Sequence, residues 1–412
     1  MKLITFFVLL AASAAASAQP LGSDVASLLD YARAHSPELT ATRHEADAAN
    51  ERIQPAGALP DPVLRTEFFD ITNQGMNKPV SLLPSQVGGT RYLMMQSVPW
   101  FGRLDLKREL ASKQAAQASQ QVSATWAELA GKIKSAYSMH YYLADSERLT
   151  RDTLALMNRL EQIARTRYAN GAGSQQDVIR AQIELSELHT ELLALQNEQH
   201  HVHVSINTLL SRPLDAALAE PEVPLSVPAR LDYAALEQKM RSRNPELMLA
   251  DARVGEAEKS RDLNLSNRYP DFTLGIAPTQ VGSAVKTWDL MVELNIPLRQ
   301  ESRRSQEREA EARLAASQAR KEQLLNQRLS ELSESISGFD SALQTDATIS
   351  QRLLPLAELS FQSALSGYQN GRVDFATLLD ARRQILKARQ QRIRAQYDAQ
   401  LRLIDIERLT GE

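Results

Sequence analysis

Long stretches of the chain place apolar residues at the spacing of an α-helix. From about Leu104 to Tyr168, residues such as Trp126 and Ile133 recur among Ala, Gln, Ser, Lys and Glu, and no proline interrupts the pattern. At a rise of about 1.5 Å per residue, this stretch predicts a helix of roughly 100 Å. A second such stretch runs from about Arg303 to Tyr368, where Pro355 predicts a kink or local unwinding. Patterns of this length are typical of coiled coils.

Each long stretch ends in the same kind of turn. The chain reads RYANGAGSQQDVIRAQ from Arg167 and GYQNGRVDFATLLDAR from Gly367. The shared residues are Tyr168, Asn170, Gly171 and Ala181 in the first turn, and Tyr368, Asn370, Gly371 and Ala381 in the second. Glycine favours the left-handed conformation that reverses a chain at a helix end. The helical pattern then returns over residues 175–210 and 375–409, which predicts two antiparallel helical hairpins.

Four shorter runs alternate apolar and polar residues with the period of a β-strand. The clearest run places Trp288, Leu290, Val292, Leu294 and Ile296 on one face, with Asp289, Met291, Glu293 and Asn295 on the other. Weaker alternation occurs over residues 64–68, 91–98 and 272–277. One face of each run is apolar and the other is polar.

These elements occur twice in the same order: helix, two strands, very long helix, turn, long helix. Pro-Glu-Leu at residues 37–39 and again at 245–247 supports an internal duplication. The unit is too long for a solenoid repeat. We predict a signal peptide at residues 1–18, a first structural repeat at 19–210, a Pro-rich linker on the outside at 211–232, and a second repeat at 233–412.

The strands allow two interpretations. They could form a small sheet packed on the helices, or they could enter a membrane with apolar residues outward and polar residues inward. Four strands cannot close a barrel, because at least about eight are needed, and open edges are not tolerated in lipid. Two copies of the chain would supply eight strands and three copies twelve, so the membrane interpretation requires an oligomer.

The first residues, MKLITFFVLLAASAAASAQP, indicate export. Lys2 precedes an apolar core, and Ala16-Ser17-Ala18 matches a cleavage site, so the mature chain is expected to begin at Gln19. The sequence has no cysteine, which excludes disulfides, thiolate metal sites and a thiol nucleophile. No later segment is apolar enough for a membrane-spanning helix.

Composition and motifs exclude several function classes. The formal net charge of -3 gives no reason to expect nucleic acid as a partner. Aromatic residues make up 5% of the chain, which suits long helices packed through Ala and Leu. No phosphate-binding glycine loop, zinc-protease motif or nucleophile elbow is present. We therefore expect neither an enzyme nor a cofactor.

Two groups of residues raise the possibility of metal binding. His200 and His203 share a helix face and could hold a cation, but a polar helix surface is the favoured explanation. Met76, Met94 and Met95 could bind a soft metal, but methionine also fills strand and loop positions without any ligand. Neither group is predicted to be a metal site.

Taken together, the duplicated order, the strand pairs, the helix lengths and the Tyr-x-x-Gly turns resemble the TolC-like outer-membrane efflux channels. The resemblance covers essentially the whole mature chain. It implies a mainly α protein with a small β part, in which long antiparallel coiled-coil hairpins and four membrane strands per chain form a trimeric 12-stranded β-barrel continued by an α-helical tunnel. Localisation would be the outer membrane of a Gram-negative bacterium, extending into the periplasm.

Two motifs are similar to the heavy-metal branch of this family, the CusC/CzcC-like channels. They are ALPDPVL from Ala58, before the first strand, and SVPWFGRLDLKRE from Ser97, after the second. Many family members carry an acylated N-terminal cysteine, which this chain lacks, so the barrel alone would anchor it. The resemblance implies a passive exit duct for heavy-metal cations, supplied by an inner-membrane pump of the RND type through a periplasmic adaptor.

The family also implies where the functional residues lie. Its gate aspartates follow the second-turn glycine by six and nine residues, and these positions hold Thr377 and Asp380 here, so only one acid matches. Asp177 occupies the corresponding place in the first repeat, although Ser174 and Asp177 also fit a helix-capping box. The expected adaptor-docking residues at the tips are Gly171, Ala172, Gly371, Arg372 and Val373.

Alternative functions remain at this point. The same architecture could export drugs or other small organic molecules. A periplasmic adaptor or a structural coiled coil is the other possibility, but adaptors carry one hairpin beside a lipoyl-like β domain, whereas this sequence has two hairpins and membrane-type strands. Selectivity in such a system belongs mainly to the pump.

Overall fold

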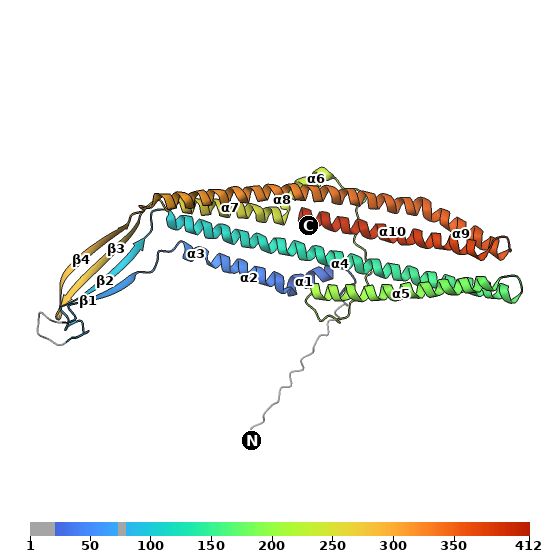
Figure 1. Cartoon of the computed structure of the whole chain (residues 1–412), viewed down its shortest axis with the longest axis horizontal. Helices are drawn as coiled ribbons and strands as arrows, with labels where there is room; N and C mark the ends of the chain where they lie inside the picture. The colour runs from blue at the N-terminus through green and yellow to red at the C-terminus, as the bar shows by residue number, and fades with distance from the viewer. Residues whose placement is uncertain (1–20, 73–79) are drawn as a thin grey trace, which may run out of the picture.

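The protein is an elongated bundle of helices with a sheet at one end and two helical turns at the other (Figure 1). The structure is a computed structural model that describes residues 21–72 and 80–412. The expected signal peptide at residues 1–18 and Met76 lie outside the described residues. The order of helices and strands confirms the prediction of a mainly helical fold with a small β part.

The described helices follow the predicted order in both repeats. They are α1 (Val25–His35), α2 (Pro37–Glu51), α3 (Ile53–Ala56), α4 (Arg103–Ala169), α5 (Gln175–Leu209), α6 (Tyr233–Arg243), α7 (Pro245–Ser266), α8 (Gln300–Thr348), α9 (Leu354–Gln369) and α10 (Phe375–Thr410). Helix α4 packs against α5 near the tip and against α2 near the sheet, while α8 packs against α10 and α7 (Figure 1). No helix in the described residues is long and apolar enough to cross a bilayer.

A short π-helical turn interrupts the second long helix. It spans Ile349–Leu353 and joins α8 to α9, and Pro355 follows it directly in the first turn of α9. Proline removes a backbone donor and crowds the preceding turn, and a wider local helix accommodates both effects. The local unwinding expected at Pro355 is confirmed.

The duplication extends to the way helices begin. Ser36 caps α2 by accepting the amide hydrogen of Leu39 at 3.3 Å, and Asn244 caps α7 by accepting that of Leu247 at 2.8 Å. A proline at the first helical position follows each cap, where its missing N–H costs nothing. The Pro-Glu-Leu match between the repeats is therefore a shared helix start.

The four strands form one antiparallel sheet in the order β1-β2-β3-β4. Their bounds are β1 (Val63–Phe69), β2 (Gly89–Val98), β3 (Asp271–Val281) and β4 (Ala284–Asn295). The pairing of β2 with β3 joins the two repeats, and in the described residues β1 and β4 each have a neighbour on one side only.

One face of this sheet is exposed and apolar. Leu64, Trp288, Leu290, Val292 and Leu294 are all exposed on it, with Leu290 reaching 79%. The opposite face differs from the polar one that we expected, because Leu93, Met95, Ala277 and Met291 form a small apolar cluster there. The cause is the YLMM segment of β2, which is apolar on both sides of the strand.

The segment between the repeats packs on the helices through side chains of α4 and α5. The Tyr137 hydroxyl lies 2.9 Å from the carbonyl of Ser23 and 2.7 Å from that of Val223, and Asn207 donates to the carbonyls of Leu214 and Ala216. His140 Nε2 donates to the carbonyl of Ala219 at 3.1 Å. These contacts fix residues 211–232 against hairpin one without regular secondary structure.

The His140 ring also touches His203, with the ring centroids 4.7 Å apart. Burial lowers the pKa of both imidazoles. Their folded-state pKa lies below the unfolded value of about 6.5, so the unfolded chain binds more protons as the pH falls through that range. Acidification should therefore destabilise the fold.

We expect the thermal unfolding midpoint to fall between about pH 7.5 and about pH 5, and to fall less in His140→Gln, whose amide can still donate to Ala219. The matched control is His44→Gln, since the His44 side chain is exposed. Differential scanning calorimetry of each variant at both pH values gives the comparison. An equal loss in the wild type and in His140→Gln would contradict the assignment.

Candidate gate and docking tips

The two turns have the same backbone geometry. Gly171 and Gly371 have φ angles of +71° and +69°, in the left-handed region that favours glycine. The amide of Ala172 donates to the carbonyl of Arg167 at 2.8 Å, and the amide of Arg372 donates to that of Gly367 at the same distance. Both helices therefore end in the same hydrogen-bonded reversal.

The tyrosines of the two turns differ in their surroundings. Tyr368 is 3% exposed, whereas Tyr168 is 48% exposed. The guanidinium of Arg167 lies 4.8 Å from the centre of the Tyr368 ring and donates to the carbonyls of Tyr368 and Gln369 at 2.6 and 2.7 Å. It also donates to the carbonyl of Ala172 at 2.9 Å. One arginine from hairpin one therefore holds both turns.

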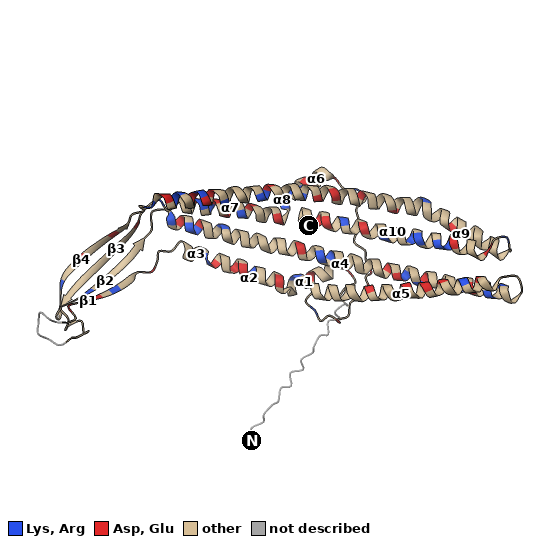
Figure 2. Cartoon of the chain, viewed as in Figure 1, with Lys and Arg blue, Asp and Glu red and all other residues tan. Residues whose placement is uncertain are grey.

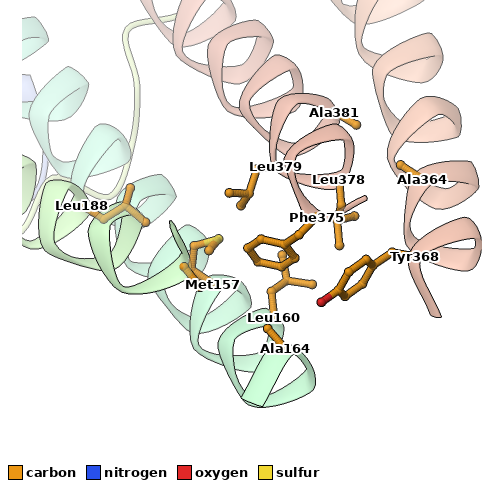
Figure 3. Close-up of a cluster of buried hydrophobic side chains, with 11 residues drawn as sticks. Met157, Leu160, Ala164, Leu188, Ala364, Tyr368, Phe375, Leu378, Leu379 and Ala381 are labelled. Carbon is orange, nitrogen blue, oxygen red and sulfur yellow. The ribbon is translucent and has the colours of Figure 1, made fainter. Parts of the chain in front are cut away.

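A hydrophobic cluster lies behind the turns and joins the two hairpins (Figure 3). Its buried members are Met157, Leu160 and Ala164 of α4, Ala181 and Leu188 of α5, Ala364 and Tyr368 of α9, and Phe375, Leu378, Leu379 and Ala381 of α10. The alanines that the two turn motifs share are thus packing positions. Because all four tip helices contribute, the tips form one structural unit.

The Asp177 carboxylate links the hairpins. It accepts a hydrogen bond from the Tyr368 hydroxyl at 3.3 Å. Burial and the nearby Asp177 charge raise the pKa of Tyr368 to about 12, so the phenol stays protonated and can donate at neutral pH. Ser174 caps α5, as the capping interpretation expects, but its hydroxyl accepts from the amide of Gln176 at 3.0 Å. The Asp177 side chain is engaged with Tyr368 instead.

The second turn presents its acids differently. Asp374 caps α10, and its carboxylate accepts from the amide of Thr377 at 2.9 Å and from the Thr377 hydroxyl at 2.6 Å. These hydrogen bonds lower the pKa of Asp374. Asp380 lies one turn further along α10 and is exposed. Of the two positions that match the family gate, Thr377 therefore serves the cap and Asp380 keeps its carboxylate at the surface.

The predicted docking residues lie at the extreme end of the molecule. Gly171, Ala172, Gly371 and Arg372 are exposed. Val373 is only partly exposed, because it packs against the tip cluster. The structure thus brings four of these five residues together as a surface and uses the fifth mainly for packing.

A partly buried ion cluster between the hairpins was not predicted from the sequence. Glu184 of α5 contacts Arg382 at 3.4 Å and Arg383 at 2.6 Å, both from α10. Arg382 is 2% exposed, and burial lowers its pKa, while the hydrogen bond that Arg383 donates to Glu184 raises the pKa of Arg383. Scattered charges on amphipathic helices gave no signal for this pairing, because the partners lie about 200 residues apart.

The candidate metal ligands are not brought together. His203 turns toward His140 of α4, whereas His200 is exposed. Met94 is exposed on the apolar face of the sheet and Met95 is buried under it. Within the described part of the chain, no group of three or more His, Cys, Asp or Glu residues could hold a metal ion.

A four-stranded sheet, two long helical hairpins and a shared tip define an elongated, duplicated α-helical protein. A family model described as "Outer membrane efflux protein" matches residues 28–212 and 236–412. The chain belongs to this family of outer membrane efflux proteins. Members of the family are transport channels, so membership supports the non-enzymatic interpretation and disfavours the adaptor and structural coiled-coil alternatives.

The chain is similar to one individual protein in sequence and to several solved structures in fold. The cobalt-zinc-cadmium resistance protein CzcC of Cupriavidus metallidurans is 24% identical over 384 residues, covering 90% of this chain and 86% of that protein. The solved structure of VceC from Vibrio cholerae matches with a TM-score of 0.79 and 19% identity, covering 95% of this chain and 99% of that one. A structure of CusC matches with a TM-score of 0.79 and 16% identity, covering 95% and 93%.

The two tyrosines provide a matched test of the tip. Tyr368→Phe removes the hydroxyl that reaches Asp177 and keeps the buried ring, so it should loosen the contact between the turns by about 1 kcal/mol. We expect amide hydrogen exchange over residues 168–178 and 368–378 to accelerate about fivefold. Tyr168→Phe is the control, since that side chain is half exposed. Similar exchange in both variants would show that the Tyr368–Asp177 bond does not hold the tip.

Proposed function

We propose that this protein is the outer-membrane exit duct of a tripartite efflux system and that it works as a homotrimer. The observation that carries the proposal is the exposed apolar face of the sheet at one end of a molecule whose other end bears two helical tips (Figure 1). In lipid such a face is favourable, but the free edges of β1 and β4 are not. Three copies supply twelve strands, enough to close a barrel in outer-membrane lipid.

The helical part then continues the barrel into the periplasm. Three copies contribute six tips, which surround one opening under threefold symmetry. The proposed gate consists of Asp380, Asp177 and Thr377. Asp380 supplies three exposed carboxylates around the opening, Asp177 holds the two hairpins of each copy together through Tyr368, and Thr377 fixes the start of α10. A ring of carboxylates in a narrow bore attracts cations.

The tip surface is also the proposed docking site for a periplasmic adaptor, which would couple the duct to an inner-membrane pump of the RND type. Gly171, Ala172, Gly371 and Arg372 form its exposed part, and Val373 supports it from behind. Arg372 is the charged member of this surface. The pump supplies the energy, and the duct itself is passive.

The proposed substrates are heavy-metal cations. Support comes from CzcC, whose name describes resistance to cobalt, zinc and cadmium, and from the motifs at Ala58 and Ser97 that resemble the heavy-metal branch. A duct for drugs or other small organic molecules, with the same architecture, is the second candidate.

The gate is tested by conductance of the purified protein in planar bilayers. Asp380→Ala should reduce the selectivity for cations and the block by divalent cations, because it removes the carboxylate nearest the proposed constriction. Asp340→Ala is the control, since this exposed acid belongs to α8 and lies far from the tip. Unchanged selectivity and block in Asp380→Ala would exclude the gate assignment.

The function is tested by growth of a deletion strain on Co, Zn, Cd, Cu and Ag salts and on a panel of organic dyes. We expect sensitivity to metal salts alone, restored by the wild type and by Arg372→Lys but not by Arg372→Glu. Heat-modifiable trimers should persist in outer membranes of the Arg372→Glu strain. Sensitivity to dyes alone would favour the second candidate, and loss of trimers would make the tip structural only.

A further inference from the structure

A polar cavity lies where the helices meet the sheet. Its volume is about 320 Å³. The lining includes Arg103 at the start of α4, Asn267 and Tyr269 between α7 and β3, Asn295 at the end of β4, and Arg299 and Arg303 at the start of α8. Residues from three separate parts of the chain thus converge on one pocket.

The cavity has an excess of positive charge. Three arginines line it against one acid, Asp271, and this acid is already bound by Arg103 at 2.5 and 2.6 Å. Figure 2 shows basic and acidic residues mixed along the start of α8, so the excess of positive charge is a property of the cavity lining alone. Arg299 is exposed and forms no ion pair with any described residue. The available charge in the cavity is therefore that of Arg299 and Arg303.

Arg299 and Arg303 both have N–H groups that donate no hydrogen bond to a described residue. Arg303 Nη1 donates to the carbonyl of Asn267, while its Nε is buried and has no partner among the described residues. Arg299 is the N-cap residue of α8 and offers no side-chain acceptor to the first turn. The amides at the start of this long helix add a partial positive charge beside the cavity. Planar guanidinium groups and helix N-termini both suit phosphate oxygens.

An aromatic stack borders the cavity, and two exposed apolar residues, Phe101 and Leu298, lie close in sequence to the lining residues Arg103 and Arg299. Tyr269 lines it and stacks on Trp100, with ring centroids 4.9 Å apart, and Trp100 stacks in turn on Phe272. Phe101 is 81% exposed and Leu298 is 83% exposed. Aromatic residues at this level, between a charged zone and an apolar strand surface, are typical of a membrane interface.

We propose that this cavity binds the phosphate of a phospholipid headgroup, with the acyl chains lying against the exposed apolar residues next to it. The inference rests on the proposed membrane position of the sheet. Arg299 and Arg303 hold the phosphate, Asn267, Asn295 and Tyr269 complete the polar surround, and Phe101 and Leu298 contact the chains. Free phosphate would find the same arginines but gain nothing from the apolar border.

The test is native mass spectrometry of the full chain purified in detergent. Dioleoyl phosphatidylglycerol should be retained, and Arg299→Gln/Arg303→Gln should weaken its binding about tenfold or more, because two charge-assisted contacts are lost. Arg313→Gln is the control, since Arg313 is an exposed residue of α8 that pairs with Glu309. Arg303→Lys should retain part of the affinity.

Two further ligands distinguish binding of a phospholipid from binding of free phosphate. Dioleoylglycerol, which has the chains without the phosphate, should not be retained, and inorganic phosphate at millimolar concentration should not displace the lipid. Equal binding of phosphatidylglycerol by the double variant, or its displacement by phosphate, would overturn the proposal. If the double variant does not assemble, Arg299→Gln alone decides, because Arg299 is exposed.

Failure here is distinguishable from failure of the efflux function. A wild-type protein that conducts in planar bilayers and supports resistance but retains no phosphatidylglycerol would refute the lipid site and leave the duct intact. A protein that retains the lipid and restores no resistance would refute the duct and leave the lipid site intact.

Discussion

An apolar sheet face that the chain cannot cover by itself is the constraint on which the rest of the structure depends. The side chains of β4 from Trp288 to Leu294 alternate outward and find no helix over them. In water, each large apolar side chain left exposed forgoes about 1.5–3 kcal/mol of burial. The helices cannot provide cover, because α4 and α8 run away from the sheet and pack on other helices (Figure 1). The proposed trimer in a membrane would cover this face with lipid and pair the free edges of β1 and β4 with neighbouring copies.

The tip at the opposite end is held together within one copy, and the proposed gate would require it to open as well. Its hydrophobic cluster draws on all four helices, which favours a single closed arrangement. Few bonds cross between the hairpins at the turns, and they are only partly buried: Arg167 donates to the second turn, and Tyr368 donates to Asp177. Contacts of this kind are each worth about 1 kcal/mol, so a docked partner of modest differential affinity could shift the arrangement.

Much of the fold could be predicted from the sequence, because helices and turns are specified by residues close together in the chain. Helix periodicity placed α4 within one residue of its ends, Pro355 marked the π-helical turn, and the turn glycines marked both reversals. The contacts between the two hairpins could not be predicted from the sequence. Arg167 with Tyr368, and Glu184 with Arg382, join residues about 200 positions apart, and nothing in either local pattern specifies the partner. The apolar inner cluster at Leu93 was missed because a strand can be apolar on both faces.

The two turns differ because the surroundings of their tyrosines differ. Both copies keep the glycine and the tyrosine, but only Tyr368 is buried, and it is buried because hairpin one supplies Arg167 above the ring and Asp177 beside the hydroxyl. Tyr168 has no equivalent among the described contacts and stays at the surface. The two copies of the turn thus differ in role: Arg167, beside the first turn, supplies the contacts, and Tyr368 of the second turn is covered by them. In the proposed trimer, this asymmetry would give each copy one turn that holds its own hairpins together and one turn, that of the exposed Tyr168, that could meet a neighbouring copy.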